Sequence, residues 1–159
     1  MSNFFYFLFG DKYISLLSFI IKCILKIYGV KIGKNFKSHE FPKLSLKNPK
    51  NLILGDNVDL KSNIEIRLYE DSRLEIGNNT KIDDGVRIIS ANNSLVKIDN
   101  DTVVGYNSVI NAGSNIQIGK KCLISGFVYL QSSSHGINKS QFIKDQKHTY
   151  EEILIKDDV

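Results

Sequence analysis

Histidine is the residue type in this chain with the chemistry to support catalysis, because the pKa of an unperturbed imidazole lies close to neutral pH. The sequence has three histidines, His39, His135 and His148. His135 lies near the start of a polar loop predicted over residues 131–152, and long polar loops are a common location for function. An imidazole there could act as a general base toward a hydroxyl group. By its spacing alone, however, His135 is a single loop histidine.

The other reactive side chains form no recognisable catalytic or metal-binding motif. The serines at 132–134 have no nucleophile elbow or triad partners, and no carboxylate or cysteine cluster in the sequence surrounds His39, which we expect in a surface turn. His148, near the end of the same loop as His135, could approach the same site, but we expect it to be a solvated loop residue. We expect no metal. Two cysteines are too few for a disulfide framework, so we expect a reducing, cytoplasmic environment.

Apolar residues recur along residues 54–130 in steps of six, grouped in threes. An aliphatic residue opens each block of six: Leu54, Leu60, Ile66, Ile76, Ile82, Ile88, Ile98, Val104, Ile110, Ile118, Ile124 and Leu130. The full period of three blocks is 22, 22 and then 20 residues. Glycine, asparagine and aspartate are frequent between the openers, where a chain that turns a corner needs left-handed backbone conformations.

This period predicts an all-β solenoid, because repeats of this length build solenoids and six-residue steps favour a β-helix. Each block supplies a short strand and a corner, and the openers stack coil on coil into one narrow core. A leucine-rich repeat is the alternative, since Leu52, Leu54 and Asn57 imitate its consensus. That architecture has one strand per repeat and gives no reason for aliphatic residues six and twelve positions after the first opener.

The blocks of six, the glycine after the opener and the Ser134-His135-Gly136 loop resemble the hexapeptide-repeat acyltransferases. These form left-handed parallel β-helices. The chain is most similar to the maltose and galactoside O-acetyltransferases and to O-acetyltransferases of capsule, lipopolysaccharide and exopolysaccharide synthesis. The resemblance covers residues 30–159, which we take as the β-helix domain, and residues 1–29 form a separate N-terminal segment.

The resemblance implies an enzyme that transfers an acetyl group from acetyl-CoA to a sugar hydroxyl, in surface polysaccharide synthesis. In the galactoside pattern the catalytic histidine falls 16 residues after a coil glycine, which places it at His135 after Gly119. An asparagine that holds the acceptor corresponds to Asn107, which is also an ordinary corner residue. The family forms homotrimers with sites between neighbouring subunits, so a homotrimer is implied.

Two departures from the family pattern bear on activity. Ala112-Gly113 stand where the family often has acidic residues, so no acidic partner for His135 is visible in the sequence. The family also continues with one or two coils that form much of the acetyl-CoA groove, whereas this sequence ends at Val159. We therefore expect a shortened relative without the C-terminal coils. The alternative hypothesis is an inactive truncated β-solenoid that serves as a binding or oligomerisation scaffold.

Residues 1–29 are apolar and basic and lie outside the repeats. We predict a helix that covers the open end of the first coil, because an exposed coil would leave its core in water. Lys22 and Lys26 make it a poor membrane span. Residues 1–50 carry a net charge of +7 and the remainder −3, so the segment could also lie peripherally on the inner membrane face. No pattern of a nucleic-acid-binding module is present.

Overall fold

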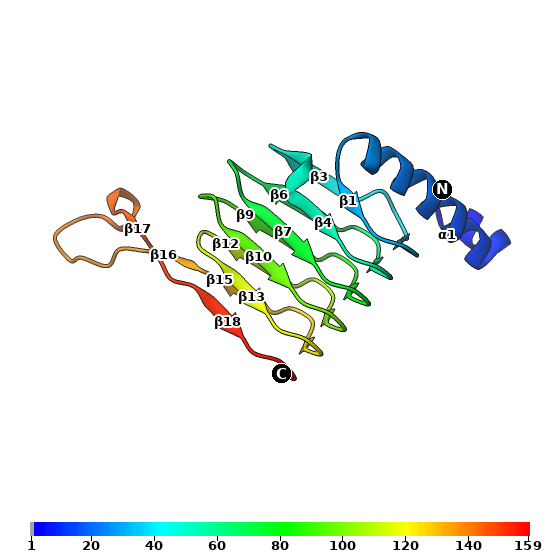
Figure 1. The fold of residues 1–159 in the computed structure, drawn as a ribbon. Helices are drawn as coiled ribbons and strands as arrows, with labels where there is room; N and C mark the ends of the chain where they lie inside the picture. The colour runs from blue at the N-terminus through cyan, green and yellow to red at the C-terminus, as the bar shows by residue number, and fades with distance from the viewer. Residues whose placement is uncertain (1) are drawn as a thin grey trace.

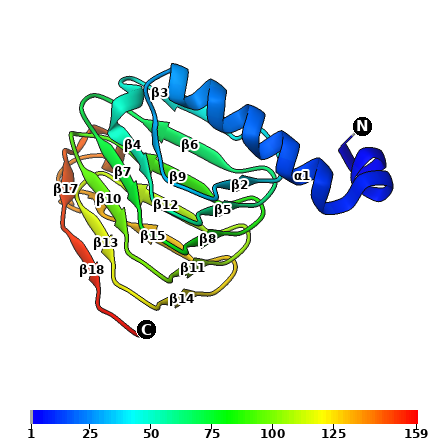
Figure 2. The same ribbon diagram turned by 45° about the vertical axis from the view of Figure 1, so that its right-hand side comes forward.

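The computed structural model describes the backbone of residues 2–159 and the side chains of residues 10–159. The protein is a parallel β-solenoid of about five turns with one helix at its N-terminal end (Figure 1; Figure 2). The predicted all-β solenoid with an N-terminal α-helix is confirmed. The leucine-rich-repeat alternative is wrong, because each full turn contributes strands to three different sheets.

Three parallel sheets form the sides of the solenoid. Sheet A contains β1 (Lys31–Ile32), β4 (Leu52–Leu54), β7 (Arg73–Ile76), β10 (Leu95–Ile98), β13 (Ile116–Ile118) and β18 (Ile153–Ile155). Sheet B contains β2 (Lys37–Ser38), β5 (Asp59–Leu60), β8 (Lys81–Ile82), β11 (Val103–Val104) and β14 (Leu123–Ile124). Sheet C contains β3 (Lys43–Leu46), β6 (Glu65–Leu68), β9 (Arg87–Ser90), β12 (Val109–Ala112) and β15 (Tyr129–Gln131). A short 3-10 helix, η1 (Pro49–Asn51), joins sheets C and A in the first turn.

The pairing register explains the sequence period. Each strand pairs in parallel with the strand one turn later, so Leu54 pairs with Ile76 and Ile76 with Ile98. Eleven of the twelve predicted openers are buried, and Leu130 is partly buried against the same core. The predicted core is therefore confirmed. The last step in sheet A runs from Ile118 to Ile155 because an inserted hairpin separates the two strands.

Asparagines hold the corners between sheets A and B. Asn57 and Asn79 adopt left-handed backbone conformations, with φ of 58° and 55°. Asparagine tolerates this conformation better than most residues, for which it costs about 1–2 kcal/mol. The amide of Asn57 donates to Oδ1 of Asn79 at 2.8 Å, and that of Asn79 donates to Oδ1 of Asp101 at 2.9 Å. This ladder ties each corner to the next coil.

Helix α1 (Ser2–Ile27) covers the first coil, as predicted (Figure 2). Its inner residues Ile21 and Leu25 are buried in the solenoid core. The Ser18 hydroxyl accepts a hydrogen bond from the backbone N–H of Ser38 at 2.9 Å, which fixes the helix on β2. The helix is kinked at Gly10, where φ is 50° and ψ is −129°. Across the described residues, no helix has the length and apolarity needed to cross a membrane.

The asparagine ladder gives a first prediction. Replacing Asn79 with alanine removes two inter-coil hydrogen bonds. It also places at positive φ a residue that lacks the side-chain amide with which asparagine tolerates this conformation. The free energy of unfolding should therefore fall by about 2 kcal/mol. Asn79→Gly keeps the conformation accessible and should cost clearly less. Urea denaturation of both variants measures the difference. Equal losses for alanine and glycine would show that the backbone conformation contributes nothing.

Candidate functional site

The predicted loop over residues 131–152 contains an antiparallel hairpin that projects from the last coil (Figure 1). Its strands are β16 (Ser133–His135) and β17 (His148–Tyr150), and a 3-10 helix, η2 (Ile143–Asp145), lies in the connection. The Gln146 side chain organises that connection: its Oε1 accepts from the N–H of Asn138 at 2.7 Å, and its Nε2 donates to the carbonyl of Gln141 at 2.9 Å. The excursion thus has an ordered structure of its own.

The base of the hairpin packs against the corner of the preceding coil. A Cβ atom added to Gly113 would lie 2.8 Å from Cβ of Ser133 and 3.0 Å from the Tyr150 ring, so only glycine leaves room for both strands. The Ser132 hydroxyl donates to the carbonyl of Ser114 at 2.8 Å and accepts from its N–H at 3.0 Å. Gly113 therefore makes room for the hairpin.

The hairpin register brings two histidines together. His135 pairs with His148 across β16 and β17. Their Nε2 atoms lie 3.2 Å apart, and their rings meet edge to face at a centroid distance of 4.1 Å. The Tyr150 hydroxyl lies 3.5 Å from Nδ1 of His148. One Nε2 must carry the hydrogen and the other accept it, so each ring constrains the tautomer of its partner.

His148 lies closer to His135 than the expectation of a solvated loop residue implies. It is exposed, as expected of a solvated loop residue, but it also contacts His135. A polar hairpin has no alternation of apolar and polar residues from which its register could be predicted. His148 thus occupies a position beside His135 where an acidic partner had been sought.

Asn107 lies at a different corner of the solenoid, between β11 and β12. Its φ is 53°, so the prediction of a corner residue is confirmed. A Cβ atom on Gly85 would lie 2.2 Å from Oδ1 of Asn107, so the amide of Asn107 packs directly against the glycine of the preceding coil. The neighbouring Tyr106 and Phe127 form an exposed edge-to-face pair with a centroid distance of 5.0 Å.

Within one chain, Asn107 and His135 do not meet. Asn107 follows strand β11 of sheet B, whereas the hairpin projects from the solenoid after strand β15 of sheet C. Strand β12 and its neighbours in sheet C therefore lie between them. A four-residue strand spans roughly 13 Å. The structure therefore assigns the two predicted residues to separate corners of the same end of the solenoid.

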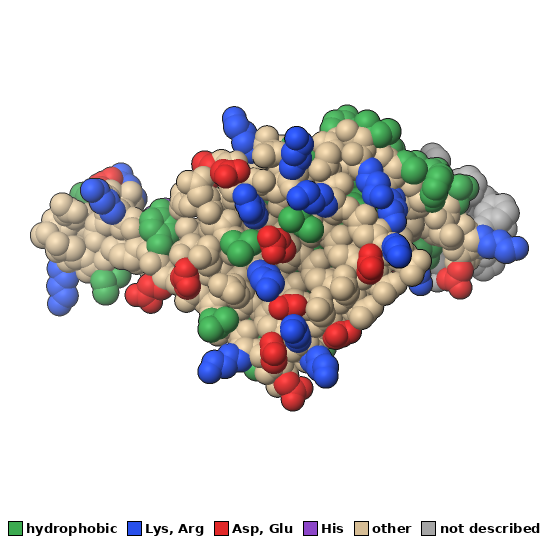
Figure 3. Space-filling view, in the orientation of Figure 1, with side chains coloured by type: hydrophobic (Ala, Val, Ile, Leu, Met, Phe, Trp, Pro, Cys, Tyr) green, Lys and Arg blue, Asp and Glu red, His purple; other side chains and the backbone are tan. Residues whose placement is uncertain are grey.

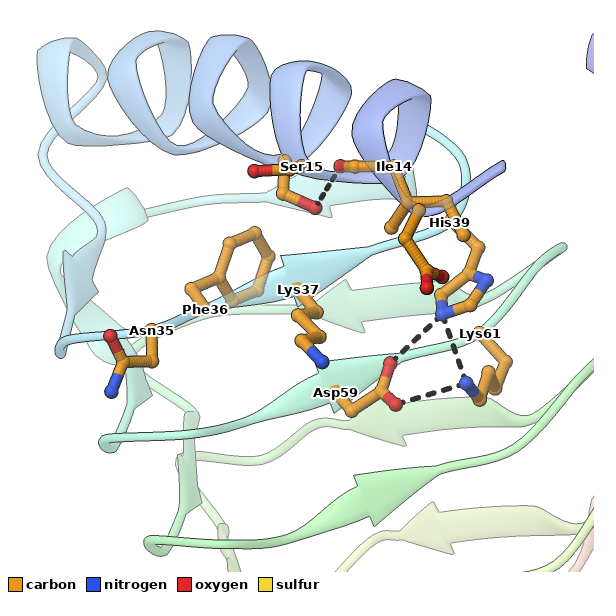
Figure 4. A pocket seen from close by; sticks show the side chains of 10 residues that line it. Ile14, Ser15, Asn35, Phe36, Lys37, His39, Asp59 and Lys61 are labelled. Atoms are coloured by element: carbon orange, nitrogen blue, oxygen red, sulfur yellow. Dashed lines mark hydrogen bonds and ion pairs between the residues drawn. The ribbon is translucent and has the colours of Figure 1, made fainter. Parts of the chain in front are cut away.

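His39 lies in a second cluster, beside a cavity of about 690 Å³ between α1 and sheet B (Figure 4). Its Nε2 lies 3.2 Å from Oδ1 of Asp59 and 2.9 Å from Nζ of Lys61. The same lysine pairs with the other oxygen of Asp59 at 2.9 Å. His39 lies in a bend and is partly exposed, as expected of a turn residue. The 22-residue period also places charged residues of the next coil, Asp59 and Lys61, beside it.

The carboxylates with clearly lowered pKa values are poor candidates for acid–base catalysis near neutral pH. The Arg67 guanidinium donates to Glu65 at 2.6 Å, and Arg87 donates to it at 2.9 Å, which together hold the pKa of Glu65 below its ordinary value. A backbone N–H bond from Asn100 similarly lowers the pKa of Asp99. These groups stay charged and stabilise the solenoid surface.

Two grooves lie on the last coils. One of about 490 Å³ runs along the outside of sheet A. It is lined by Lys97, Asp99, Gln117, Ile118, Gly119, Leu154, Ile155, Lys156 and Asp157. Another of about 280 Å³ lies at the base of the hairpin. It is lined by Gln131, Ser132, Ser133, Ser134, Thr149, Glu151, Glu152 and Ile153. Among the residues whose side chains are described, no three His, Cys, Asp or Glu side chains gather in a way that could hold a metal ion.

Comparisons with known proteins add no family to this geometry. No family model, no curated protein and no solved structure matches the chain. The coil geometry is compatible with a hexapeptide-repeat β-helix, since three short strands and three corners make up each turn. Function must therefore be argued from the hairpin, the corners and the grooves themselves.

Proposed function

We propose that the protein is an O-acetyltransferase that moves an acetyl group from acetyl-CoA to a hydroxyl of a sugar. The observation that supports this most directly is the His135–His148 pair on an ordered hairpin whose base carries a groove lined with hydroxyl and carboxylate side chains. Exposed imidazole and nearby hydrogen-bonding groups are what a general base for a hydroxyl acceptor requires. The resemblance to hexapeptide-repeat acyltransferases supports the same reaction.

In the proposed reaction, His135 takes the proton of the acceptor hydroxyl as its oxygen attacks the thioester carbonyl carbon. The tetrahedral intermediate then collapses with cleavage of the carbon–sulfur bond. The imidazolium returns its proton to the departing thiolate, so the products are the acetyl ester and free coenzyme A. His148 acts as a positioning residue, because its Nε2 lies 3.2 Å from Nε2 of His135 and its ring packs edge to face against that imidazole.

We assign the acetyl-CoA donor to the groove on sheet A. Lys97 and Lys156 line it together with Asp99 and Asp157, and Lys97 pairs with Asp99 at 3.3 Å. Lys156 is therefore the ammonium group that would bind a phosphate of coenzyme A. Gly119 lets the following coil pack closely along this groove, because a Cβ atom there would lie 2.4 Å from Oδ1 of Asp157. We propose that this surface binds the nucleotide end of acetyl-CoA.

The acceptor is proposed to bind between the hairpin of one chain and the Asn107 corner of its neighbour in a homotrimer. The support is that the two predicted residues lie at separate corners of one chain, so only a second chain can complete a shared site. Tyr106 and Phe127 present exposed ring faces beside Asn107. Such faces suit the apolar side of a sugar ring, and the Asn107 amide suits its hydroxyls.

Removal of the base gives the direct test of the reaction. His135→Ala should lower kcat for acetyl transfer by about 10²–10⁴-fold, the usual effect of losing a general base. His148→Gln should lower kcat less and alter its pH profile, because a positioning residue acts through His135. His39→Gln is the matched control and should retain activity. Turnover by His135→Ala equal to that of the unaltered chain would exclude the assigned role.

The shared site makes a second prediction. His135→Ala and Asn107→Ala chains should each show poor activity at limiting acceptor concentration. When the two variants are co-expressed and mix at random, about one site in four should combine an intact His135 with an intact Asn107, and activity should return to that extent. If the co-expressed variants are no more active than each variant alone, His135 and Asn107 do not form a site shared between two chains, and the proposed shared site is excluded.

A further inference from the structure

Helix α1 has a second apolar face that points away from the solenoid. Its exposed residues follow a spacing of three and four, which places them on one side of the helix: Leu16, Phe19, Ile20, Cys23 and Ile27. Phe19 is 66% exposed and Ile27 is 84% exposed. The buried residues Ile21 and Leu25 lie on the opposite side. Both faces of the helix are therefore apolar, and only one of them is covered by the solenoid.

Lysines surround this outer face. Lys12 and Lys26 are exposed on α1, and Lys31 and Lys50 are exposed just beyond its C-terminal end. The stem of Lys50 lies close to the end of the helix, since a Cβ atom on Gly29 would be 3.5 Å from its Cγ. In Figure 3 apolar side chains gather over α1, with lysines beside them. Among the side chains described on the helix, Asp11 is the only acidic one.

We propose that this outer face of α1 rests on an anionic lipid surface. An exposed apolar stripe flanked by lysines has the chemistry of a helix that lies in the membrane interface. The apolar side chains enter the region between headgroups and acyl chains, and the ammonium groups meet the lipid phosphates. A surface position also agrees with the finding that no described helix could cross a membrane. This inference does not depend on acetyl transfer.

A second copy of the chain fits this face less well. A two-fold contact would place each lysine-rimmed patch against an identical patch, and like charges would repel. A stable protein interface also uses about 20–30 residues a side, far more than one helical stripe supplies. An anionic lipid surface instead neutralises the lysines while it covers the apolar residues.

Docking through α1 fixes how the solenoid is held. The helix covers the first coil, while the His135 hairpin projects from the last one (Figure 1). Successive coils are about 4.8 Å apart, the spacing of neighbouring strands, so the last coil lies roughly 20 Å from the first. The hairpin therefore faces away from the lipid surface and remains open to a solution ligand.

Sedimentation with lipid vesicles tests the proposal. The full chain should sediment with phosphatidylcholine vesicles that contain phosphatidylglycerol, bind less to pure phosphatidylcholine, and be released as salt is raised. The double variant Leu16→Gln, Phe19→Gln should bind roughly tenfold more weakly or worse, because two large apolar side chains no longer enter the interface. Phe142→Gln is the matched control: Phe142 is 77% exposed but lies on the hairpin, and its replacement should change nothing.

A charge variant separates the two contributions. Lys26→Gln with Lys31→Gln should weaken binding to the anionic vesicles and leave the weak binding to pure phosphatidylcholine unchanged. No sedimentation of the unaltered chain, or equal sedimentation of the Leu16, Phe19 double variant, would overturn the proposal. Light scattering provides a further check without lipid. If the double variant had a lower oligomeric mass than the unaltered chain, the face would belong to a contact between copies instead.

Discussion

Every other feature of this protein depends on the hydrogen bonding of one coil to the next. Each strand must repeat the path of the strand one turn earlier, at the fixed spacing of a parallel sheet. Residues separated by one period therefore become neighbours, as Leu54 and Ile76 do in sheet A. The requirement for inward aliphatic side chains and for left-handed corners follows from this repetition, since any coil that departed from it would break contacts on both of its sides.

Function is expected where the repetition stops. At one end α1 replaces a coil and covers the core with one of its two apolar faces. At the other end the chain leaves the coil between β15 and β18 and forms the hairpin, whose antiparallel pairing obeys different rules. The coil below still controls that excursion, because Gly113 and Ser114 hold its base. A rigid stack thus presents two chemically distinct ends.

Features that follow from the repeated coils could be predicted from the sequence, whereas the contacts within the hairpin could not. The openers, the corners and the helix could be located because burial and left-handed φ values select residue types at fixed steps. The contact of His39 with Asp59 and Lys61 could have been found from the same 22-residue step, by aligning neighbouring coils. The pairing of His135 with His148 could not, since the hairpin is polar throughout and its register leaves no period in the sequence. Asn107 was recognised as a corner residue, but its distance from the hairpin depends on which corner each one occupies.

The most direct test of the account is a calorimetric titration of acetyl-CoA into the purified chain, with the oligomeric state measured by light scattering. We predict saturable binding by a trimer, with one donor per chain, and weaker binding by Lys156→Glu because that lysine lines the groove proposed for the phosphates. The absence of binding by a folded, soluble protein would contradict acetyl transfer. It would instead favour a solenoid that acts as a scaffold.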